Sequence, residues 1–274
     1  MQVRHFDTIA PPVSHDVWGT LCGGNRAEPV RWSIAEEVPV AVLVNGAHFA
    51  VVMATPADLE DFALGFALNE GILRQPSDLQ RLAIAEVADG YLVNLRVSDQ
   101  RATAAEARRR NLPARAGCGI CGAQTLAAAV PALPRISGIM PNTDAVLRAY
   151  RAFPGWQEMR ARNRSTHAAA LCDLSGEVLA VREDIGRHNA LDKLAGFAAG
   201  QELDTSRCFV LLSSRISFEM VQKAARIGVP LVAAASAPSA LSLRAAGQAG
   251  MTLAVALDTE LMIFTPERAE EPAA

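Results

Sequence analysis

Alternating apolar and polar positions in the first half of the chain predict two β-hairpins. The runs VPVAVLV and AHFAVVM meet at Asn45-Gly46, a residue pair typical of a two-residue type I′ turn. A second pair of runs, LAIAEV and YLVNLRV, meets at Asp89-Gly90. We therefore expect a smaller α+β N-terminal region that is rich in hairpins.

A helix is expected between these hairpins. Thr55-Pro56 is predicted to open it, and Asp58, three residues after Thr55, comes close to a capping box. Gly71 is predicted to end it. Its apolar face is expected at Leu59, Phe62 and Phe66.

In the second half, strand-like and helix-like runs alternate. A helical stretch over 143–162 precedes a hairpin (HAAALCDL, EVLAVRED) and a helix (HNALDKLAGFAA). The strands CFVLLSS, PLVAAAS and TLAVAL then alternate with the helices FEMVQKAARIG and ALSLRAAGQAG, before a last strand LMIFT. Alternation at this spacing favours a largely parallel, three-layer α/β unit.

These patterns predict a division of the chain into segments. We expect an extended arm over residues 1–30, an α+β domain over 31–115, a cysteine loop with a helix over 116–142, an α/β domain over 143–266 and a flexible tail over 267–274.

Composition narrows the class of protein. Half of the 274 residues are apolar and the net charge is −3, which gives no reason to expect binding to nucleic acid. No apolar run reaches the length of a membrane span, and five cysteines do not form a disulfide framework in a chain of this size. We expect a protein of the reducing cytoplasm.

Cys118 and Cys121, in the stretch GCGICG, are the most informative residues. The flanking glycines leave both sulfurs sterically accessible, and the run after them, Ala123 to Val130, is rich in helix formers. A thiol before a helix is exposed to the helix dipole, which favours the thiolate.

Several roles for this pair compete. A zinc site needs two more ligands, but Cys22, Cys172 and Cys208 are isolated in the sequence and no bound metal is expected. A thioredoxin-like pair should follow a strand, whereas a basic, proline-containing linker precedes this one. A persulfide relay needs an accessible loop, a low thiol pKa and a stabilising neighbour such as Arg115. A loop whose cysteines do no chemistry is the fourth possibility.

Polar residues also gather after two of the predicted strands. The segment REDIGRHN over 182–189 favours either helix capping or a ligand pocket at a strand end, which His167 could also face. Ser213-Ser214-Arg215 precedes a helix, where backbone N–H groups bind phosphate, while Ser217 is suited to ordinary N-capping. Ser236 to Ser239 occupies the same position after the next strand.

Taken together, these stretches resemble the formate dehydrogenase accessory protein family, the FdhD sulfurtransferases or sulfur carriers. The resemblance covers about residues 30–266. It rests, in order, on VNGAHFAVVMATPADLEDFALGF, NEGI, GCGICG, THAAAL, REDIGRHNALDKL, SFEMVQKAARIGVPLV, SAPSAL and the closing MTL and IFT. The resemblance implies that the α/β domain is cytidine-deaminase-like. His167 is followed by two alanines, so the H-x-E pair of zinc deaminases is missing.

The resemblance also implies a function. A cysteine desulfurase passes sulfur to Cys118, which Cys121 assists, and the sulfur goes to the molybdenum cofactor in its bis(molybdopterin guanine dinucleotide) form. This cofactor is then inserted into the formate dehydrogenase catalytic subunit. A homodimer is expected by the same analogy. The cofactor is expected to contact His167, Arg187, His188, Ser213, Arg215 and the loop Ala256, Leu257, Asp258, Thr259, Glu260 and Leu261.

Two alternatives stay open. The chain could be a maturation chaperone that binds the cofactor or the apo-enzyme without turning over sulfur. It could also be a thiol-disulfide oxidoreductase, which would require a reversible disulfide between Cys118 and Cys121 and no sulfur donor.

Overall fold

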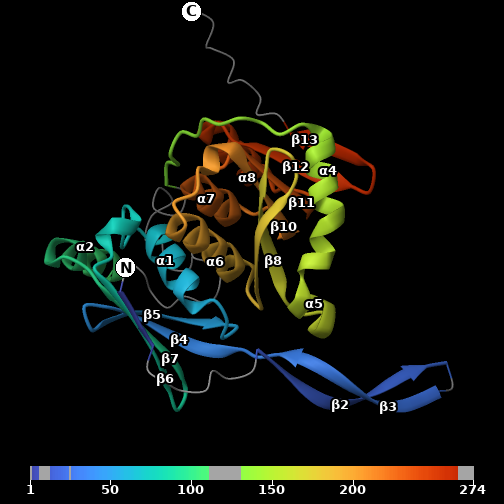
Figure 1. The fold of residues 1–274 in the computed structure, drawn as a ribbon, viewed down its shortest axis with the longest axis horizontal. Coiled ribbons are helices and arrows are strands. Elements are labelled where there is room, and N and C mark those ends of the chain that lie inside the picture. Colours follow the sequence, from blue (N-terminus) through green and yellow to red (C-terminus); the bar gives the residue numbers. More distant parts are fainter. Residues whose placement is uncertain (1, 6–12, 25, 111–130, 265–274) are drawn as a thin grey trace, which may run out of the picture.

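The computed structural model describes residues 2–5, 13–24, 26–110 and 131–264 (Figure 1). Its strands form a five-stranded sheet, a six-stranded sheet and a separate two-stranded hairpin. No helix in this part of the chain is long and apolar enough to cross a membrane.

The five-stranded sheet belongs to the first half of the chain, and its strand order is β1-β6-β7-β4-β5. Both predicted hairpins are confirmed, with Asn45 and Gly46 at the positive φ angles (50° and 85°) that a type I′ turn needs. Helix α1 packs its apolar residues on one face of this sheet. The strands are β1 (Gln2–His5), β4 (Val38–Val44), β5 (Ala47–Ala54), β6 (Arg81–Val87) and β7 (Gly90–Arg96).

Helix α1 (Leu59–Asn69) begins later than the sequence predicts. Thr55 does not cap it, because its side chain is buried and its hydroxyl accepts a hydrogen bond from Ile185 N–H at 3.1 Å. The helix instead starts after Asp58, which adopts a left-handed conformation with φ 50°. A short η1 (Pro76–Asp78) follows, and α2 (Asp99–Arg110) closes this half.

The six-stranded sheet of the second half has the order β13-β12-β11-β10-β8-β9 and is mixed, not largely parallel. Only β10–β11 and β11–β12 pair in parallel. The hairpin places β8 between β9 and β10, antiparallel to both, and β13 returns beside β12 through a tight turn. The strands are β8 (His167–Asp173), β9 (Val178–Asp184), β10 (Cys208–Arg215), β11 (Leu231–Ser236), β12 (Thr252–Leu257) and β13 (Glu260–Phe264).

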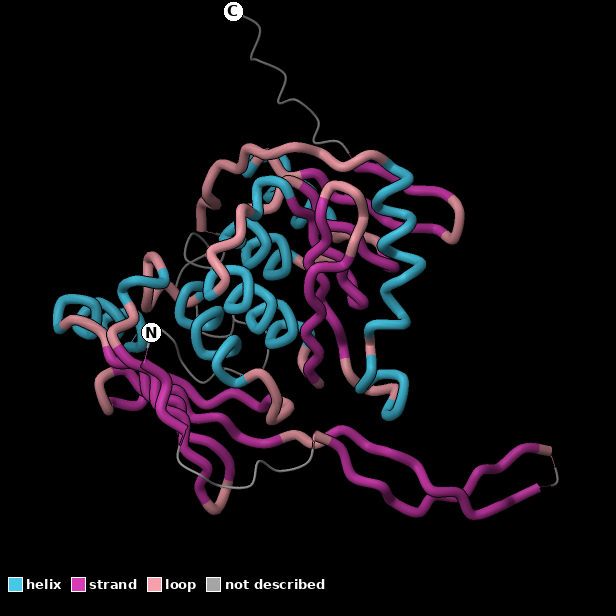
Figure 2. The backbone as a smooth tube through the Cα atoms, in the orientation of Figure 1, coloured by secondary structure: helices cyan, strands magenta, loops and turns pink. Residues whose placement is uncertain are grey.

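Helices cover both faces of this sheet, as the cyan and magenta segments of Figure 2 show. On one face lie α6 (Arg187–Gly200), α7 (Phe218–Ile227) and α8 (Ala240–Ala249), and on the other lies α4 (Thr143–Ala152). The elements η2 (Phe153–Trp156), α5 (Glu158–Asn163) and η3 (Thr205–Arg207) complete the fold. The predicted fold class, a three-layer α/β unit beside a smaller hairpin-rich α+β region, is confirmed.

The two sheets are joined by a close crossing of α1 and α6. A Cβ atom on Gly65 would lie 1.8 Å from the Asp192 carbonyl oxygen, and one on Gly196 would lie 1.8 Å from the Asp61 carbonyl oxygen. The backbones therefore touch at positions where only glycine leaves room. An ion pair between Arg182 Nη2 and Asp61 Oδ2, at 2.6 Å, ties β9 to α1 beside this crossing.

A two-stranded hairpin, β2 (Ser14–Gly23) and β3 (Arg26–Ala35), projects from the body (Figure 1). The sequence suggested an extended arm over residues 1–30. The structure instead has β1 in the five-stranded sheet and an antiparallel hairpin that continues to Ala35. From its base the chain runs directly into β4. We call residues 14–35 the arm.

Candidate functional site

The two cysteines of the predicted relay, Cys118 and Cys121, lie outside the described residues. The described cysteines differ from one another. Cys172 and Cys208 are buried in strands, and burial raises the pKa of each thiol, so neither is suited to forming a thiolate. Cys22 is exposed on the arm.

One edge of the six-stranded sheet collects most of the other predicted residues. The strands β10, β11 and β12 end there, α6, α7 and α8 begin there, and β8 starts there because it runs antiparallel to β10. His167 is the first residue of β8, Arg187 and His188 open α6, and Ser213 and Arg215 end β10. Carboxyl ends of parallel strands are the usual ligand position in such folds.

The two histidines at this edge are held in the neutral form. Burial lowers the pKa of His188 to about 3, with further contributions from Lys223, Arg187 and His167. Burial also lowers the pKa of His167, as do Arg160 and Arg187. Both imidazoles therefore remain uncharged at neutral pH, because burial and the cationic side chains around them both oppose protonation.

Three buried polar atoms at this edge have no hydrogen-bond partner among the described residues. They are His167 Nδ1, His188 Nε2 and Ser217 Oγ. Ser217 stands at the N-cap of α7 without making a capping hydrogen bond, so its predicted capping role is wrong. Buried polar atoms normally find a partner, and a ligand at this edge would supply one.

The serines on the neighbouring turns are already engaged. Ser213 Oγ accepts a hydrogen bond from Ala168 N–H at 2.8 Å, and this bond links β10 to β8. Ser239 Oγ accepts from Ser242 N–H at 3.2 Å and so caps α8. Arg215, in contrast, is exposed and accessible to an anion.

The polar segment 182–189 divides into structural and candidate functional residues. Glu183 accepts hydrogen bonds from the N–H groups of Met159 and Arg160, both at 2.8 Å, and so caps α5. Asp184 is buried and pairs with Lys193 Nζ. Arg187 and His188 remain for a ligand. Capping and pocket were open alternatives for this segment, and its residues divide between them.

The loop Ala256 to Leu261 lies at the same edge but farther along it. It forms the turn from β12 to β13, where Leu257 pairs with Glu260 and the side chains from 257 to 260 are exposed. β12 lies three strand spacings from β8, or about 14 Å. A compact ligand therefore cannot contact both this turn and the histidines, whereas an elongated one can.

Sequence reasoning missed Ser217 as a ligand candidate and did not consider Lys223. Lys223 Nζ lies 2.5 Å from Asp192 Oδ1, and Asp192 is buried. Through this pair, α7 places a cation near His188. In the sequence, Lys223 is only a lysine in the second turn of an amphipathic helix, and such lysines are usually on the protein surface.

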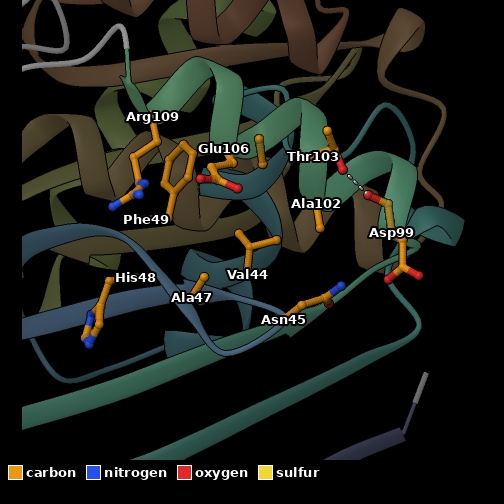
Figure 3. Close-up of a pocket in the computed structure, with 11 residues that line it drawn as sticks. Val44, Asn45, Ala47, His48, Phe49, Asp99, Ala102, Thr103, Glu106 and Arg109 are labelled. Carbon is orange, nitrogen blue, oxygen red and sulfur yellow. Dashed lines mark hydrogen bonds between the residues drawn. The ribbon is translucent and has the colours of Figure 1, made fainter.

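A separate cavity of about 250 Å³ lies in the first half of the molecule, between the β4–β5 turn and α2 (Figure 3). Arg109, at the far end of α2 in that view, borders it together with Phe49 and His48. The neighbouring Arg108 donates to the Glu70 carbonyl oxygen at 2.8 Å and thus caps the end of α1. Arg108 therefore has a structural role.

Comparison with known proteins is consistent across sequence and structure. A sulfur carrier protein FdhD from Xanthomonas euvesicatoria pv. vesicatoria (strain 85-10) is 44% identical over 248 residues, covering 89% of this chain and 88% of the relative. One from Bordetella petrii is 45% identical over 221 residues, covering 80% of each chain.

A solved structure agrees with the fold. The crystal structure of a putative formate dehydrogenase accessory protein from Desulfotalea psychrophila superimposes with a TM-score of 0.74 at 20% identity, covering 93% of this chain and 97% of that one. The FdhD/NarQ family model matches residues 35–269. With that match over most of its length and relatives at this identity, the chain belongs to the FdhD/NarQ family.

Proposed function

We propose that this protein is a sulfur carrier in the maturation of formate dehydrogenase, and that it works as a sulfurtransferase through a cysteine persulfide. This proposal is supported by membership of the FdhD/NarQ family, in which relatives are named sulfur carriers. It is also supported by the glycine-flanked Cys118-x-x-Cys121 of this chain. The donor is a cysteine desulfurase.

The proposed sulfur transfer uses both cysteines. The Cys118 thiolate attacks the outer sulfur of the desulfurase persulfide, the S–S bond of the donor breaks, and the desulfurase thiolate leaves. Cys118 then carries the transferred sulfur. Attack by the Cys121 thiolate on the inner sulfur releases the outer sulfur as hydrosulfide. The two cysteines supply the electrons and become a disulfide, which a thiol reductant reopens.

The described thiols support assigning this role to Cys118. A persulfide carrier must be accessible and partly ionised at neutral pH, which burial and a raised pKa deny to Cys172 and Cys208. Cys22 is accessible, but it lies on the arm and not beside a second cysteine. It provides the matched control for experiments on Cys118.

The proposed substrate is the bis(molybdopterin guanine dinucleotide) form of the molybdenum cofactor. The orphaned atoms of His167, His188 and Ser217 favour a polar ligand at the sheet edge, and the helix N-termini together with Arg187 and Arg215 favour an anionic one. The turn over 256–261, about 14 Å away along the edge, suits a molecule as long as a dinucleotide.

The first test is intact-protein mass after incubation with a cysteine desulfurase and cysteine. Wild type and Cys22→Ser should gain about 32 Da in a form that a reductant removes, as expected of a reactive thiolate, and Cys118→Ala should not. A gain that persists in Cys118→Ala would overturn the assignment.

The alternative is a chaperone that binds the cofactor or the apo-enzyme without sulfur turnover. Activation of formate dehydrogenase separates the two. The Cys118→Ala variant should abolish activation if sulfur passes through Cys118 and should spare it if the protein only binds. A variant that folds, activates the enzyme and carries no sulfur would establish the chaperone in place of the carrier.

A further inference from the structure

Small side chains on α2 leave the cavity open between this helix and the β4–β5 hairpin. Ala102 and Ala105, three positions apart on one face of α2, line the cavity together with Val44 of β4 and Phe49 of β5. An alanine does not fill the space that a leucine or isoleucine would fill at the same position. A cavity of about 250 Å³ with apolar walls therefore remains (Figure 3).

The walls of this cavity are held in position by contacts outside it. The Arg101 guanidinium donates to the carbonyl oxygens of Gly71 and Ile72, which follow α1, at 3.0 and 2.7 Å. These bonds fix α2 beside the end of α1. The Phe49 ring is held by an edge-to-face contact with Phe66, at 6.2 Å between the ring centroids. The cavity is therefore formed before any ligand binds.

Opposite charges stand at the two ends of the cavity. Arg109 borders one end with His48, Asp99 borders the other, and Glu106 lines the space between them (Figure 3). The side chains of Arg109 and Asp99 are exposed, and neither forms a hydrogen bond or ion pair with another described residue. An acid at the start of a helix and a base at its end also suit the helix dipole. Here, however, they border a cavity with apolar walls, so both charges are available to a ligand that enters it.

The distance between these charges suits an extended peptide. Asp99 and Arg109 are ten residues apart on one helix, which is about 15 Å along its axis. An extended chain covers that length with about four or five residues. A complementary segment has an apolar side chain in its middle, an acidic residue at one end for Arg109 and a basic residue at the other for Asp99.

The cavity is also close in sequence to the proposed sulfur carrier. Arg109 precedes Cys118 by nine residues, and nine residues of chain span at most about 32 Å. A protein docked at the cavity therefore stays within that distance of the cysteine. The residues assigned to the cofactor belong to the six-stranded sheet and its helices, and the cavity shares none of them. This location favours the protein that delivers sulfur to Cys118 over the cofactor that receives it.

We propose that the cavity beside α2 is the docking site for an extended segment of the sulfur donor, the cysteine desulfurase, with an apolar side chain in the cavity, an acidic residue at Arg109 and a basic residue at Asp99. This assignment rests on the proposed function, since a donor is needed only if Cys118 carries sulfur. A contact of this size belongs to the class of small, transient interfaces. Such a contact suits a carrier that must leave its donor after each transfer.

The test measures the rate of sulfur loading on the full-length protein, by intact-protein mass, at several concentrations of the protein with a cysteine desulfurase and cysteine. Ala102→Phe fills the cavity, and Arg109→Glu reverses the charge at its end. Each should raise the concentration that gives the half-maximal rate at least about tenfold, because docking is weaker. Ala107→Phe, at an exposed position of α2 that does not line the cavity, is the matched control and should load as wild type does.

A small persulfide separates docking from reactivity. Glutathione persulfide needs no docking site, so it should load both variants at the wild-type rate. Loss of loading from both donors would overturn the docking site, because the substitutions would then act on Cys118 itself. Circular dichroism checks that each variant is folded. Arg109→Glu, at an exposed position, provides the test if Ala102→Phe does not fold.

The remaining outcomes distinguish this site from the proposed function. If wild type is loaded by the desulfurase and both variants load with the same half-maximal concentration, the docking site is wrong and the proposed function stands. If wild type takes no sulfur from the desulfurase, the proposed function is wrong, and the docking site falls with it.

Discussion

Lys193 Nζ lies 2.8 Å from Asp184 Oδ2, and neither side chain is exposed to solvent. The ammonium also donates to the carbonyl oxygens of Thr55 and Glu183, at 3.0 and 3.3 Å, which uses all three of its hydrogens. Asp184 in turn accepts from Thr55 N–H at 3.0 Å. The pair therefore links the end of β5 in one sheet to the end of β9 in the other.

Removing one partner of this pair should destabilise the fold strongly. Lys193→Met leaves Asp184 buried without its cation, which costs about 3–5 kcal/mol of unfolding free energy. Chemical denaturation measures the loss. The double variant with Asp184→Asn should recover part of it, because no uncompensated charge remains. If Lys193→Met were as stable as wild type, water would have to reach Asp184, and the prediction would be wrong.

The crossing of α1 and α6 should not tolerate a methyl group. Gly196→Ala would place Cβ 1.8 Å from the Asp61 carbonyl oxygen, so the helices must move apart and lose packing. We expect a loss of at least about 2 kcal/mol, measured by urea denaturation. Gly200→Ala is the matched control on the same helix. Its Cβ would meet only Leu64 Cδ2 at 3.7 Å, so its stability should stay equal or rise.

Stability should fall in mild acid because of His188. Its folded pKa of about 3 lies below its ordinary value near 6.5, so the unfolded chain binds a proton in this window and the folded chain does not. The unfolding free energy should decrease as pH drops from about 6.5 toward 3, by at most about 1.4 kcal/mol per pH unit from this group. His188→Gln should flatten that slope, whereas His48→Gln, at an exposed position on β5, should keep it. An unchanged slope in His188→Gln would contradict the prediction.

Ser217→Ala and Ser239→Ala should differ in their effect on stability. Ser239→Ala removes a capping hydrogen bond and should cost about 1 kcal/mol of stability. Ser217→Ala removes a hydroxyl that makes no hydrogen bond in the described structure, so stability should change little. If a ligand supplies its partner, Ser217→Ala should instead weaken binding of guanosine diphosphate, measured by calorimetry, several-fold. Equal affinity in both variants would remove Ser217 from the site.

Structure that depends on residues close together in the sequence can be predicted, whereas structure that depends on residues far apart in the sequence cannot. The turns at Asn45-Gly46 and Asp89-Gly90 need only neighbouring residues, and both were placed correctly. Thr55 was misassigned as a cap because its hydroxyl partner, Ile185, lies 130 positions away in the chain. The six-stranded sheet has fewer parallel strand pairs than the sequence predicts, because alternation of strands and helices does not reveal that β8 lies between β9 and β10.

The candidate site shows the same division. Polar residues at strand ends could be recognised from composition, and His167, Arg187 and His188 do gather at one edge. What local sequence could not distinguish was which hydroxyls the fold already satisfies. Ser213 and Ser239 have internal partners and Ser217 has none among the described residues, although all three lie beside similar helix starts.

Helix α6 begins at the candidate site with Arg187 and His188 and crosses α1 at Gly196, with Asp192 held between Asn69 of α1 and Lys223 of α7. Helix α6 therefore borders the candidate site and also joins the two halves of the molecule. Separating the two halves would first break the contact between α1 and α6. If a dinucleotide binds at this edge as proposed, a movement of α6 or of the residues beside Asp184 would carry its effect to the first half.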